Sequence, residues 1–542
     1  MADLERLIYK DGIIEIPDCS YPKTTGGAGC RYFDNITKNK DRVFQVDALT
    51  GEEDSYGAVL QRSIRTALKM RSLGVTPDDM ISTCSFNHLN TFVPYISALF
   101  LGATTVNFDA KIPISESIHS MNLVHPKIIF VAERDVEYME TLLNVTNRTA
   151  ILVVFGKSDK YMEYSEFTRP IEGEDCFVPI DVDDSKIAYI VFTSGSTGFP
   201  KGICVSHRAH VLQVAQSLSI DTAYDVMLLF SRLSWATSLH FCGVTILGGF
   251  KRITAPKFQS NLAWNIINDY KPTFMFLSPF QIATMRSDQE LYKRDVSSLK
   301  LVIIGGGFVY DHQIMYYRKL FPNAKVTIGY GQTEVGSLTY FVTDTRRKMK
   351  FMTTKIKSVG SALNGIAYKV VDVDTEQTLG FYRTGELRIK CKHLLSGYHN
   401  RDSSDAWDSD GWFKTGDLVY YDEDYYFYYV ERIKELIKYQ STNVFPKLLE
   451  KVLLMHPNVT SAYVVSIPHD IDGEHPVAFI LLKDYENGHN IEAELNKCVE
   501  EHLGDNYKLR GGIRIIKALP ITATGKVHTR ELKNMAKSFI IN

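Results

Sequence analysis

The chain has 542 residues, with 61 Lys and Arg against 63 Asp and Glu, so its formal net charge is −2. Its apolar share of 45% and charged share of 23% are typical of folded globular proteins and exclude a disordered chain. At about 150 residues per domain, this length predicts roughly three or four folding units. The near-zero net charge provides no general attraction for nucleic acid or for an anionic membrane.

The spacing of the cysteines and the sequences at the two chain ends indicate the cellular compartment in which the protein is expected. The eight cysteines form no Cys-x-x-Cys pair, which argues against a zinc ribbon or a thioredoxin-type site and favours reduced thiols. Residues Met1–Lys10 mix charged with apolar side chains, unlike a signal peptide, and the chain ends in Phe539–Asn542 rather than Ser-Lys-Leu. The apolar run Tyr95–Val106 is too short for the ~20 residues of a membrane span and predicts a buried core helix. We therefore expect a cytoplasmic protein without a transmembrane segment.

The first elements in chain order are short apolar strands that run into turns. Ala188–Phe192 leads into a Gly-rich loop, Thr273–Leu277 into Ser278-Pro279, and Leu301–Ile304 into Gly305-Gly306-Gly307. Helical patterns separate these runs. Alternation of this kind predicts an α/β architecture with largely parallel sheets.

The pattern changes twice toward the C-terminus. From about residue 360, short β runs such as Lys369–Val373 and Glu386–Ile389 follow one another with few helical segments between them. After about residue 430, Phe445–Met455 predicts a helix and alternating β segments follow. We place a domain boundary near Glu431, which divides the chain into residues 1–430 and 431–542.

Two glycine-rich loops carry different signals. The loop Thr193–Gly202, TSGSTGFPKG, combines hydroxyls, glycines and Lys201, and can turn its backbone N–H groups around an anion. Pro200 before that lysine and Gly202 after it exclude the P-loop pattern. The second loop, Gly305-Gly306-Gly307, lacks the Rossmann fingerprint because Tyr310 stands where a third spaced glycine is required.

The segment Tyr189–Gly202, YIVFTSGSTGFPKG, resembles the phosphate-loop signature of the adenylate-forming enzymes: acyl-CoA synthetases, 4-coumarate–CoA ligases and beetle luciferases. Four further segments fit the same family in the same order: Gly329–Glu334, Gly411–Leu418, Arg432–Lys438 and Ile521–Lys526. The resemblance extends from about residue 30 to about residue 535 and is strongest to the luciferase-like acyl-CoA ligases of insects. It implies a large N-terminal domain of stacked doubly wound sheets with a β-barrel-like subdomain. A small α+β C-terminal domain on a hinge would follow.

The resemblance also implies a reaction. A carboxylate attacks the α-phosphate of ATP, pyrophosphate leaves, and the acyl-adenylate passes its acyl group to CoA. The expected small-molecule partners are therefore ATP, Mg²⁺, CoA and a carboxylic acid, with a medium- or long-chain fatty acid as the favoured acid. We expect a monomer or weak homodimer and no nucleic-acid partner. Because two anions meet and charge spreads over phosphoryl oxygens, the site needs positive charge and hydrogen-bond donors more than a base.

Roles for individual residues follow from the same resemblance. Thr333 would donate to the α-phosphate, Glu334 would hold Mg²⁺, and Lys526 would bridge the carboxylate and the α-phosphate. The phosphate-loop donors would be Thr193, Ser194, Gly195, Ser196, Thr197, Gly198 and Lys201. The other nucleotide-binding residues would be Gly305, Gly306, Gly329, Tyr330 (stacked on adenine), Gly331, Asp417 (on the ribose hydroxyls), Arg432 and Asn443.

The second half-reaction would use a different lysine. In the family the small domain rotates after the adenylate forms, and Lys434 stands at the hinge position. Rotation would bring the segment of Lys438 and Asn443 to the adenylate, so that Lys526 and Lys438 are used in turn.

Several positions depart from the family pattern. Trp235 stands where beetle luciferases have the second histidine of a pair, and we expect it to wall the acyl pocket with Thr237 and Gly307. His240 nearby is interpreted as a core or hydrogen-bonded histidine, and Gln213 replaces a luciferase arginine. In the stretch after Lys438, the residues Gln440 and Ser441 replace the usual lysine and glycine near the CoA path, which bears on the thioester step.

Three alternatives to a CoA ligase stay open. One is a luciferase, which forms the same adenylate and then oxygenates an activated luciferin carbon. Another is acyl transfer to a carrier protein supplied in trans. The third is a binding protein without turnover, although the six expected functional groups are all present: Thr193, Lys201, Glu334, Asp417, Arg432 and Lys526. The sequence leaves the acid and its chain length open.

Overall fold

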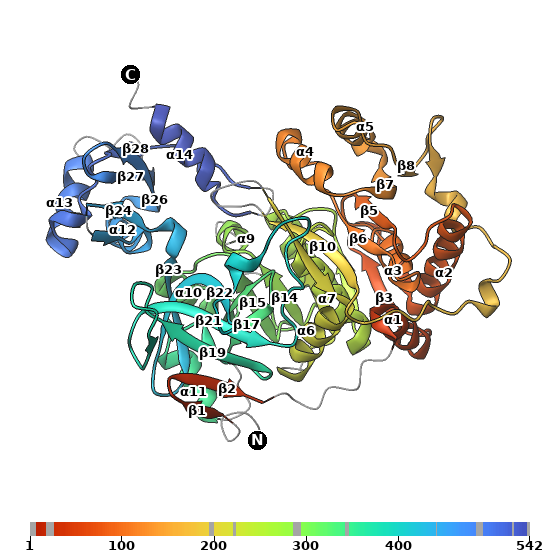
Figure 1. Cartoon of the computed structure of the whole chain (residues 1–542), viewed down its shortest axis with the longest axis horizontal. Coiled ribbons are helices and arrows are strands. Elements are labelled where there is room, and N and C mark those ends of the chain that lie inside the picture. The colour runs from red at the N-terminus through yellow and green to blue at the C-terminus, as the bar shows by residue number, and fades with distance from the viewer. Residues whose placement is uncertain are drawn as a thin grey trace.

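The computed structural model describes residues 7–17, 26–193, 200–220, 224–285, 294–341, 346–440, 442–483, 491–522 and 525–538. Within these ranges the strands form sheets of 16, seven and five strands, with helices packed against them. Figure 1 shows a large body, coloured red to cyan, and a smaller blue C-terminal lobe beside it. The predicted α/β class and the division into a large and a small part are confirmed. Six predicted positions lie outside the described residues: Ser194, Gly195, Ser196, Thr197, Gly198 and Ser441.

The seven-stranded sheet is parallel except at one edge, where β10 and β11 form a hairpin. Its inner strand β7 is almost continuously apolar because both faces are covered. Ile128 and Phe130 pack into one core, whereas Ile129 and Val131 pack into the core of α4 and α5 on the other face. The strand order is β11 (Lys201–Ser206), β10 (Ile187–Thr193), β6 (Thr104–Val106), β5 (Met80–Cys84), β7 (Pro126–Ala132), β8 (Ile151–Phe155) and β9 (Met162–Glu163). The helices around it are α1 (Gly27–Lys38), α2 (Tyr56–Ser72), α3 (Val93–Phe100), α4 (Ile114–Leu123) and α5 (Val136–Val145).

The apolar segment Tyr95–Val106 is buried as predicted, but its prediction as one helix is wrong. Helix α3 ends at Phe100 and strand β6 begins at Thr104. Gly102 lies between them with φ +67°, a left-handed conformation that favours glycine and ends helices. Among the described residues, no helix is both long enough and apolar enough to cross a bilayer.

In the described chain, the 16-stranded sheet has a parallel half and an antiparallel half that meet at β16. Strand β16 pairs in parallel with β15 and antiparallel with β17. The predicted strands at 273–277 and 301–304 are β14 and β15. The parallel half contains β3 (Val43–Asp47), β13 (Lys251–Thr254), β12 (Val226–Leu229), β14 (Phe274–Leu277), β15 (Leu301–Gly305) and β16 (Lys325–Gln332), with β4 (Glu53–Ser55) at its edge.

The antiparallel half accounts for the change of pattern near residue 360. There, neighbouring strands follow one another through turns rather than through crossover helices. It contains β17 (Gly336–Tyr340), β18 (Gly360–Ala362), β23 (Tyr426–Arg432), β22 (Phe413–Tyr421), β21 (Gly385–Cys391), β19 (Ile366–Val371), β20 (Thr378–Leu379), β2 (Ile13–Ile16) and β1 (Ile8–Lys10). Helix α11 (Arg346–Thr354) also belongs to this region.

Helices cover both faces of the parallel half. Helices α8, α9 and α10 bury apolar side chains against one face, around Trp264 and Tyr317. Side chains of α6 and α7 share a core with the other face. Their bounds are α6 (His207–Ile220), α7 (Ala236–Gly248), α8 (Ser260–Tyr270), α9 (Pro279–Met285) and α10 (Asp311–Leu320).

The C-terminal lobe is built on the five-stranded sheet. The helix predicted at 445–455 is α12, Pro446–Leu453, with Pro446 in the first turn, where its missing N–H costs nothing. Leu449 and Leu453 bury its apolar stripe. The chain passes from the large sheet into this one between Arg432 and Ile437. Its elements are β25 (Thr442–Val444), β24 (Ile437–Tyr439), β27 (Gly473–Leu482), β26 (Val459–His469), β28 (Ile513–Ile515), α12, α13 (Ile491–Leu503) and α14 (Thr529–Ser538).

Candidate active site

A cavity of about 1030 Å³ lies where the carboxyl ends of several parallel strands meet. Strands β14, β15 and β16 are mutually parallel, so Leu277, Gly305 and Gln332 end at the same edge. Ligands of open α/β sheets bind at this edge. The β10–β11 hairpin, in which Thr193 pairs with Lys201, and the C-terminal lobe complete the walls.

Most of the described candidate residues line this one cavity. They are Thr193, Lys201, Trp235, Thr237, Gly305, Gly306, Gly329, Tyr330, Gly331, Thr333, Glu334, Arg432, Lys434 and Lys526. Four described candidates do not line it: Gly307, Asp417, Lys438 and Asn443.

Glycines allow the backbone to close tightly around the cavity. A Cβ at Gly331 would lie 2.1 Å from the carbonyl oxygen of Gly336, which no side chain can tolerate. Gly306 has φ +83°, and a Cβ there would lie 3.8 Å from Cε of Lys526. The Lys526 side chain therefore reaches across from the C-terminal lobe to the loop after β15.

Asp417 lies just behind the cavity wall and is the centre of a hydrogen-bond network. The carboxylate is 1% exposed, and its Oδ2 accepts from the Tyr330 hydroxyl at 2.8 Å and from Nε2 of Gln332 at 2.7 Å. Its Oδ1 accepts from Nε of Arg432 at 3.1 Å, across the β22–β23 pair. Desolvation is the largest single influence and opposes the charge of Arg432, but Asp417, Tyr429 and Glu435 together raise the pKa of the guanidinium. Tyr330, Asp417 and Arg432 thus form one rigid unit.

Sequence reasoning assigned no role to Gln332 or Tyr398. Gln332 belongs to the GYGQTE motif, so the motif contained a signal for it. Nothing in the sequence marks Tyr398, whose ring centroid lies 4.4 Å from Nζ of Lys201 and whose hydroxyl lies 3.4 Å from Oε1 of Glu334. Burial raises the pKa of Glu334 and lowers the pKa of Lys201. Both groups therefore lie where an added ion of opposite charge would be favoured.

The two candidate lysines lie on different parts of the protein surface. Lys526 lines the cavity and remains solvent-exposed, and desolvation by the surrounding atoms, followed by the charge of Arg432, lowers the pKa of its ammonium. Lys438 is exposed on β24, opposite Asn443 of β25, and its backbone N–H donates to Glu474 at 2.9 Å. The structure therefore presents one lysine to the cavity and keeps the other away from it.

Comparisons with known proteins agree with this geometry. The profile of the AMP-binding enzyme family matches residues 32–399, more than half of the chain, and that of the AMP-binding enzyme C-terminal domain matches residues 448–526. The chain belongs to the AMP-binding enzyme family. This confirms the resemblance to adenylate-forming enzymes.

Similar proteins of this family have different named activities. Luciferin 4-monooxygenase of Photinus pyralis is 30% identical over 89% of this chain and 88% of its own length. The 4-coumarate-CoA ligase 1 of Narcissus pseudonarcissus is 28% identical over 92% of each chain. The solved structure of a luciferase-like enzyme from the nonluminescent Zophobas morio mealworm is 33% identical, with a TM-score of 0.75, over 78% of this chain and 99% of that one.

In this AMP-binding enzyme a largely apolar part of the cavity extends between α6 and α7. Trp235 and Thr237 lie on its wall, and the indole Nε1 of Trp235 has no hydrogen-bond partner among the described residues. The apolar lining is formed by Ile220, Tyr224, Phe241, Phe276, Leu301 and Ile303. Gly307, predicted to line the acyl pocket, lies outside the lining, and a Cβ there would be 3.1 Å from Cγ of Pro279.

The same part of the cavity holds polar groups, among them Ser217, to which sequence reasoning assigned no role. Ser217 on α6 and His240 on α7 approach to 2.9 Å between Oγ and Nε2. Burial lowers the pKa of His240 to about 4, so its imidazole is neutral at pH 7. Gln213 also lines the cavity, and its Nε2 donates to the carbonyl of His393 at 3.0 Å. His240 is thus hydrogen-bonded, as predicted, but it also lines the cavity.

Proposed function

We propose that this AMP-binding enzyme activates a medium- or long-chain fatty acid with ATP and then transfers the acyl group to CoA. In the first step a carboxylate oxygen bonds to the α-phosphorus of ATP, and the bond from that phosphorus to the pyrophosphate oxygen breaks. In the second step the CoA thiolate attacks the acyl carbon and AMP leaves. The observation that carries the proposal is that Lys526, Lys201 and Glu334, from three separate regions, line one cavity.

In the first step, the protein's main task is to bring two anions together. The ammonium of Lys526 would bridge the attacking carboxylate and the α-phosphate, and would stabilise the charge that develops between them. Thr193 and Thr333 also line the cavity and provide hydroxyl donors, and Lys201 would add a positive charge toward the leaving pyrophosphate. Ser194, Gly195, Ser196, Thr197 and Gly198 would complete the phosphate loop.

Glu334 fits the role of a Mg²⁺ ligand. Its carboxylate lines the cavity, and burial raises its pKa. Among the described residues, the Tyr398 hydroxyl at 3.4 Å is its one side-chain hydrogen-bond partner. A hard divalent cation shared with phosphate oxygens would neutralise that carboxylate. When bound, Mg²⁺ supplies charge stabilisation on the phosphates.

The nucleoside would occupy the side of the cavity formed by β15, β16 and β22. Gly305, Gly306, Gly329 and Gly331 leave room for the adenine beside the Tyr330 ring. We propose that Asp417 and Arg432 bind the ribose. Because Tyr330 and Gln332 occupy Oδ2 of Asp417 in this structure, the ribose hydroxyls would share or displace those contacts.

For the second step we propose a rotation of residues 431–542 relative to residues 1–430. Lys434 lies in a single 3₁₀ turn, Ile433–Glu435, between the last strand of the large sheet and the first strand of the lobe. Rotation there would withdraw Lys526 and bring Lys438 and Asn443 to the adenylate. The position of Lys438 outside the cavity, while Lys526 lines it, supports an exchange of the two lysines.

The apolar lining between α6 and α7 supports an alkyl chain as the rest of the acid. A second candidate function is a luciferase, which the 30% identity to a luciferin 4-monooxygenase favours.

The test is to incubate the protein with ATP, Mg²⁺ and a panel of fatty, aromatic and luciferin-type acids. Pyrophosphate release with and without CoA, acyl-CoA formation and light are recorded together. Acyl-CoA from a fatty acid supports the ligase, light from a luciferin-type acid supports the luciferase, and absence of pyrophosphate with every acid contradicts both.

A further inference from the structure

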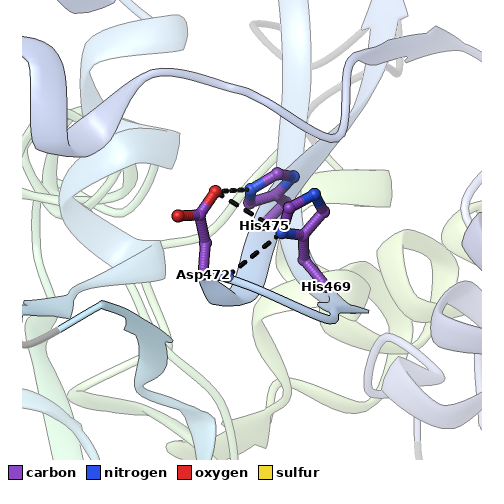
Figure 2. A group of neighbouring side chains, drawn as sticks. All are labelled: His469, Asp472 and His475. Atoms are coloured by element: carbon purple, nitrogen blue, oxygen red, sulfur yellow. Dashed lines mark hydrogen bonds and ion pairs between the residues drawn. The ribbon is translucent and has the colours of Figure 1, made fainter.

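A cluster of potential metal ligands lies in the C-terminal lobe, apart from the cavity. His469 is the last residue of β26, Asp472 lies in the following turn, and His475 lies near the start of β27. Figure 2 shows the three side chains converging on one side of this hairpin. One ligand atom from each lies within 4.8 Å of the others. None of the three lines the cavity of the proposed reaction.

The spacing of these atoms is close to that of a coordination shell. Oδ2 of Asp472 is 2.8 Å from Nε2 of His475 and 3.4 Å from Nδ1 of His469. Bonds of about 2.0–2.1 Å from Zn²⁺ to nitrogen or oxygen place neighbouring ligands of a tetrahedron about 3.3 Å apart. The two imidazole rings are stacked, with centroids 3.9 Å apart and planes inclined by 21°. Small side-chain rotations would therefore bring all three atoms onto one ion.

The Asp472 carboxylate is held in place by Gln440, which directly follows strand β24. Nε2 of Gln440 donates to Oδ1 of Asp472 at 2.9 Å, and the backbone N–H of Gln440 donates to the Asp472 carbonyl at 2.7 Å. A hydrogen bond to the second oxygen of a ligating carboxylate is a common support of metal sites, because it orients the ligand. One contact opposes an ion: the Asp472 N–H donates to Nδ1 of His469 at 3.1 Å, and metal binding through that atom would replace it.

We propose that His469, Asp472 and His475 bind a divalent transition-metal ion, with Zn²⁺ as the fitting example. Two imidazoles and one carboxylate suit Zn²⁺ and its first-row neighbours rather than Mg²⁺ or Ca²⁺, which prefer oxygen ligands alone. Three protein ligands leave one position for water or for a ligand from solution. The hairpin is partly exposed, since His469 is 39% exposed, so an ion can enter from solvent.

Such an ion would also influence the strand of Lys438. Asp472 and Gln440 join the hairpin to the end of β24, and Lys438 lies two residues before Gln440. The N–H of Lys438 is bonded to Glu474 of the same hairpin. Binding of a metal would therefore stiffen the face of the lobe that carries Lys438. This consequence, unlike the metal site itself, rests on the proposed function.

The experiment measures metal binding by the full chain, without reference to activity. After treatment with a chelator, Zn²⁺ alone is titrated calorimetrically into the wild type, His469→Ala/His475→Ala, and the matched control His456→Ala/His502→Ala. We expect one Zn²⁺ site in the wild type and in the control. The Zn²⁺ affinity should fall at least about tenfold in His469→Ala/His475→Ala. Gln440→Ala is titrated as well, and its Zn²⁺ affinity should fall about tenfold or more. Circular dichroism and denaturant unfolding verify that each variant is folded.

Three results of the Zn²⁺ titration would overturn the proposal. One is equal Zn²⁺ affinity in the wild type and in His469→Ala/His475→Ala. Another is an absence of wild-type binding, and the third is an equal loss in His456→Ala/His502→Ala. Because Cys176 is exposed and free, Co²⁺ is titrated in parallel. Absorption typical of thiolate ligation would assign the bound ion to cysteine and also contradict the proposal.

Discussion

The hydroxyl of Tyr310 donates to Oε2 of Glu450 at 2.7 Å and so joins the large body to the C-terminal lobe. Tyr310 precedes α10, whereas Glu450 lies on α12 and is 2% exposed. Nζ of Lys447 contacts the same carboxylate at 2.9 Å and 3.1 Å. This contact holds the lobe in the orientation that places Lys526 in the cavity.

Loss of the Tyr310 hydroxyl should weaken that orientation. In Tyr310→Phe, Glu450 keeps Lys447 but loses its contact with the large body. A hydrogen bond to a charged group contributes about 1.5–3 kcal/mol, so we expect adenylation to slow about tenfold while thioester formation from preformed adenylate is maintained. Rapid-quench measurement of each half-reaction checks this. Tyr138→Phe, which removes a hydroxyl within the N-terminal body, should change neither rate, and equal slowing of both half-reactions by Tyr310→Phe would contradict the prediction.

Replacement of Lys526 tests the first step directly. Lys526→Ala removes the ammonium nearest the loop at Gly306, and we expect adenylation to fall about 10²–10³-fold, roughly 3–4 kcal/mol. Thioester formation from preformed adenylate and CoA should persist. Pyrophosphate release and single-turnover thioester assays measure the two steps. Lys537→Ala, on the exposed side of α14, is the matched control, and an equal loss of both steps in a folded Lys526→Ala protein would refute the assignment.

Lys438 should show the opposite pattern. Because Lys438 is exposed and outside the cavity here, Lys438→Ala should release pyrophosphate at nearly the wild-type rate. Thioester formation should slow about tenfold or more, since one positive charge is lost from the rotated site. Acyl-CoA formation from isolated adenylate measures this. A variant that slows adenylation as much as thioester formation would argue against alternation of the two lysines.

Glu431 predicts an unusual pH dependence of stability. Its carboxylate is fully buried and accepts from the Lys447 N–H at 2.9 Å. Burial raises the pKa of Glu431 to about 7, against an ordinary value of 4.5, although Lys447 opposes the shift. As pH rises, the Glu431 carboxyl thus loses its proton at a lower pH in the unfolded state than in the folded state. The resulting stability is fully present below pH ~4.5 and is lost as pH rises through ~7.

Glu431→Gln imitates the protonated carboxyl and should remove this dependence. At pH 8 we expect the variant to be more stable than the wild type by about 1–3 kcal/mol, since one pKa unit corresponds to about 1.4 kcal/mol. Near pH 5 the two should be similar. Denaturant unfolding at both pH values, with exposed Glu53→Gln as the control, provides the measurement. A stability difference that does not grow between pH 5 and pH 8 would show that the carboxyl is ionised throughout.

Trp235 should limit the length of the acid. Trp235→Ala would enlarge the cavity beside α7, and we expect kcat/KM to shift toward longer acids, about tenfold or more per methylene at the selective end of the series. Competition between acids of graded length measures the shift. Trp412→Phe, whose side chain lies outside the cavity, should leave the preference unchanged. An unchanged length preference in Trp235→Ala would place the wall of the acyl site elsewhere.

Local patterns predicted several strands and the helix α12 for physical reasons, whereas the residues around the cavity were predicted from the family resemblance. The apolar run of β10 and the proline at the start of α12 act over a few residues, so sequence alone reveals them. The family motifs located Lys201 and Lys526, which the structure places on one cavity. The meeting of Ser217 with His240 could not be predicted, because it depends on how α6 packs against α7.

Two further features depend on long-range arrangement. Gly102 turns the segment Tyr95–Val106 into a helix and a strand, although its apolar composition alone suggests one element. Which of Lys526 and Lys438 faces the cavity is set by the orientation of the whole lobe. Contacts such as that of Tyr310 with Glu450 determine this orientation, and no local pattern encodes it.

The pairing of Asp417 with Arg432 across β22 and β23 has a mechanical consequence. Arg432 ends its strand, and the single turn that contains Lys434 follows at once. On the proposed function, the hinge of the moving lobe would therefore lie beside the ribose of the nucleotide, with Lys438 close to the hinge along the chain and Lys526 near the far end of the same lobe. The enzyme would exchange one catalytic lysine for the other while Asp417 and Arg432 keep the ribose of the intermediate bound.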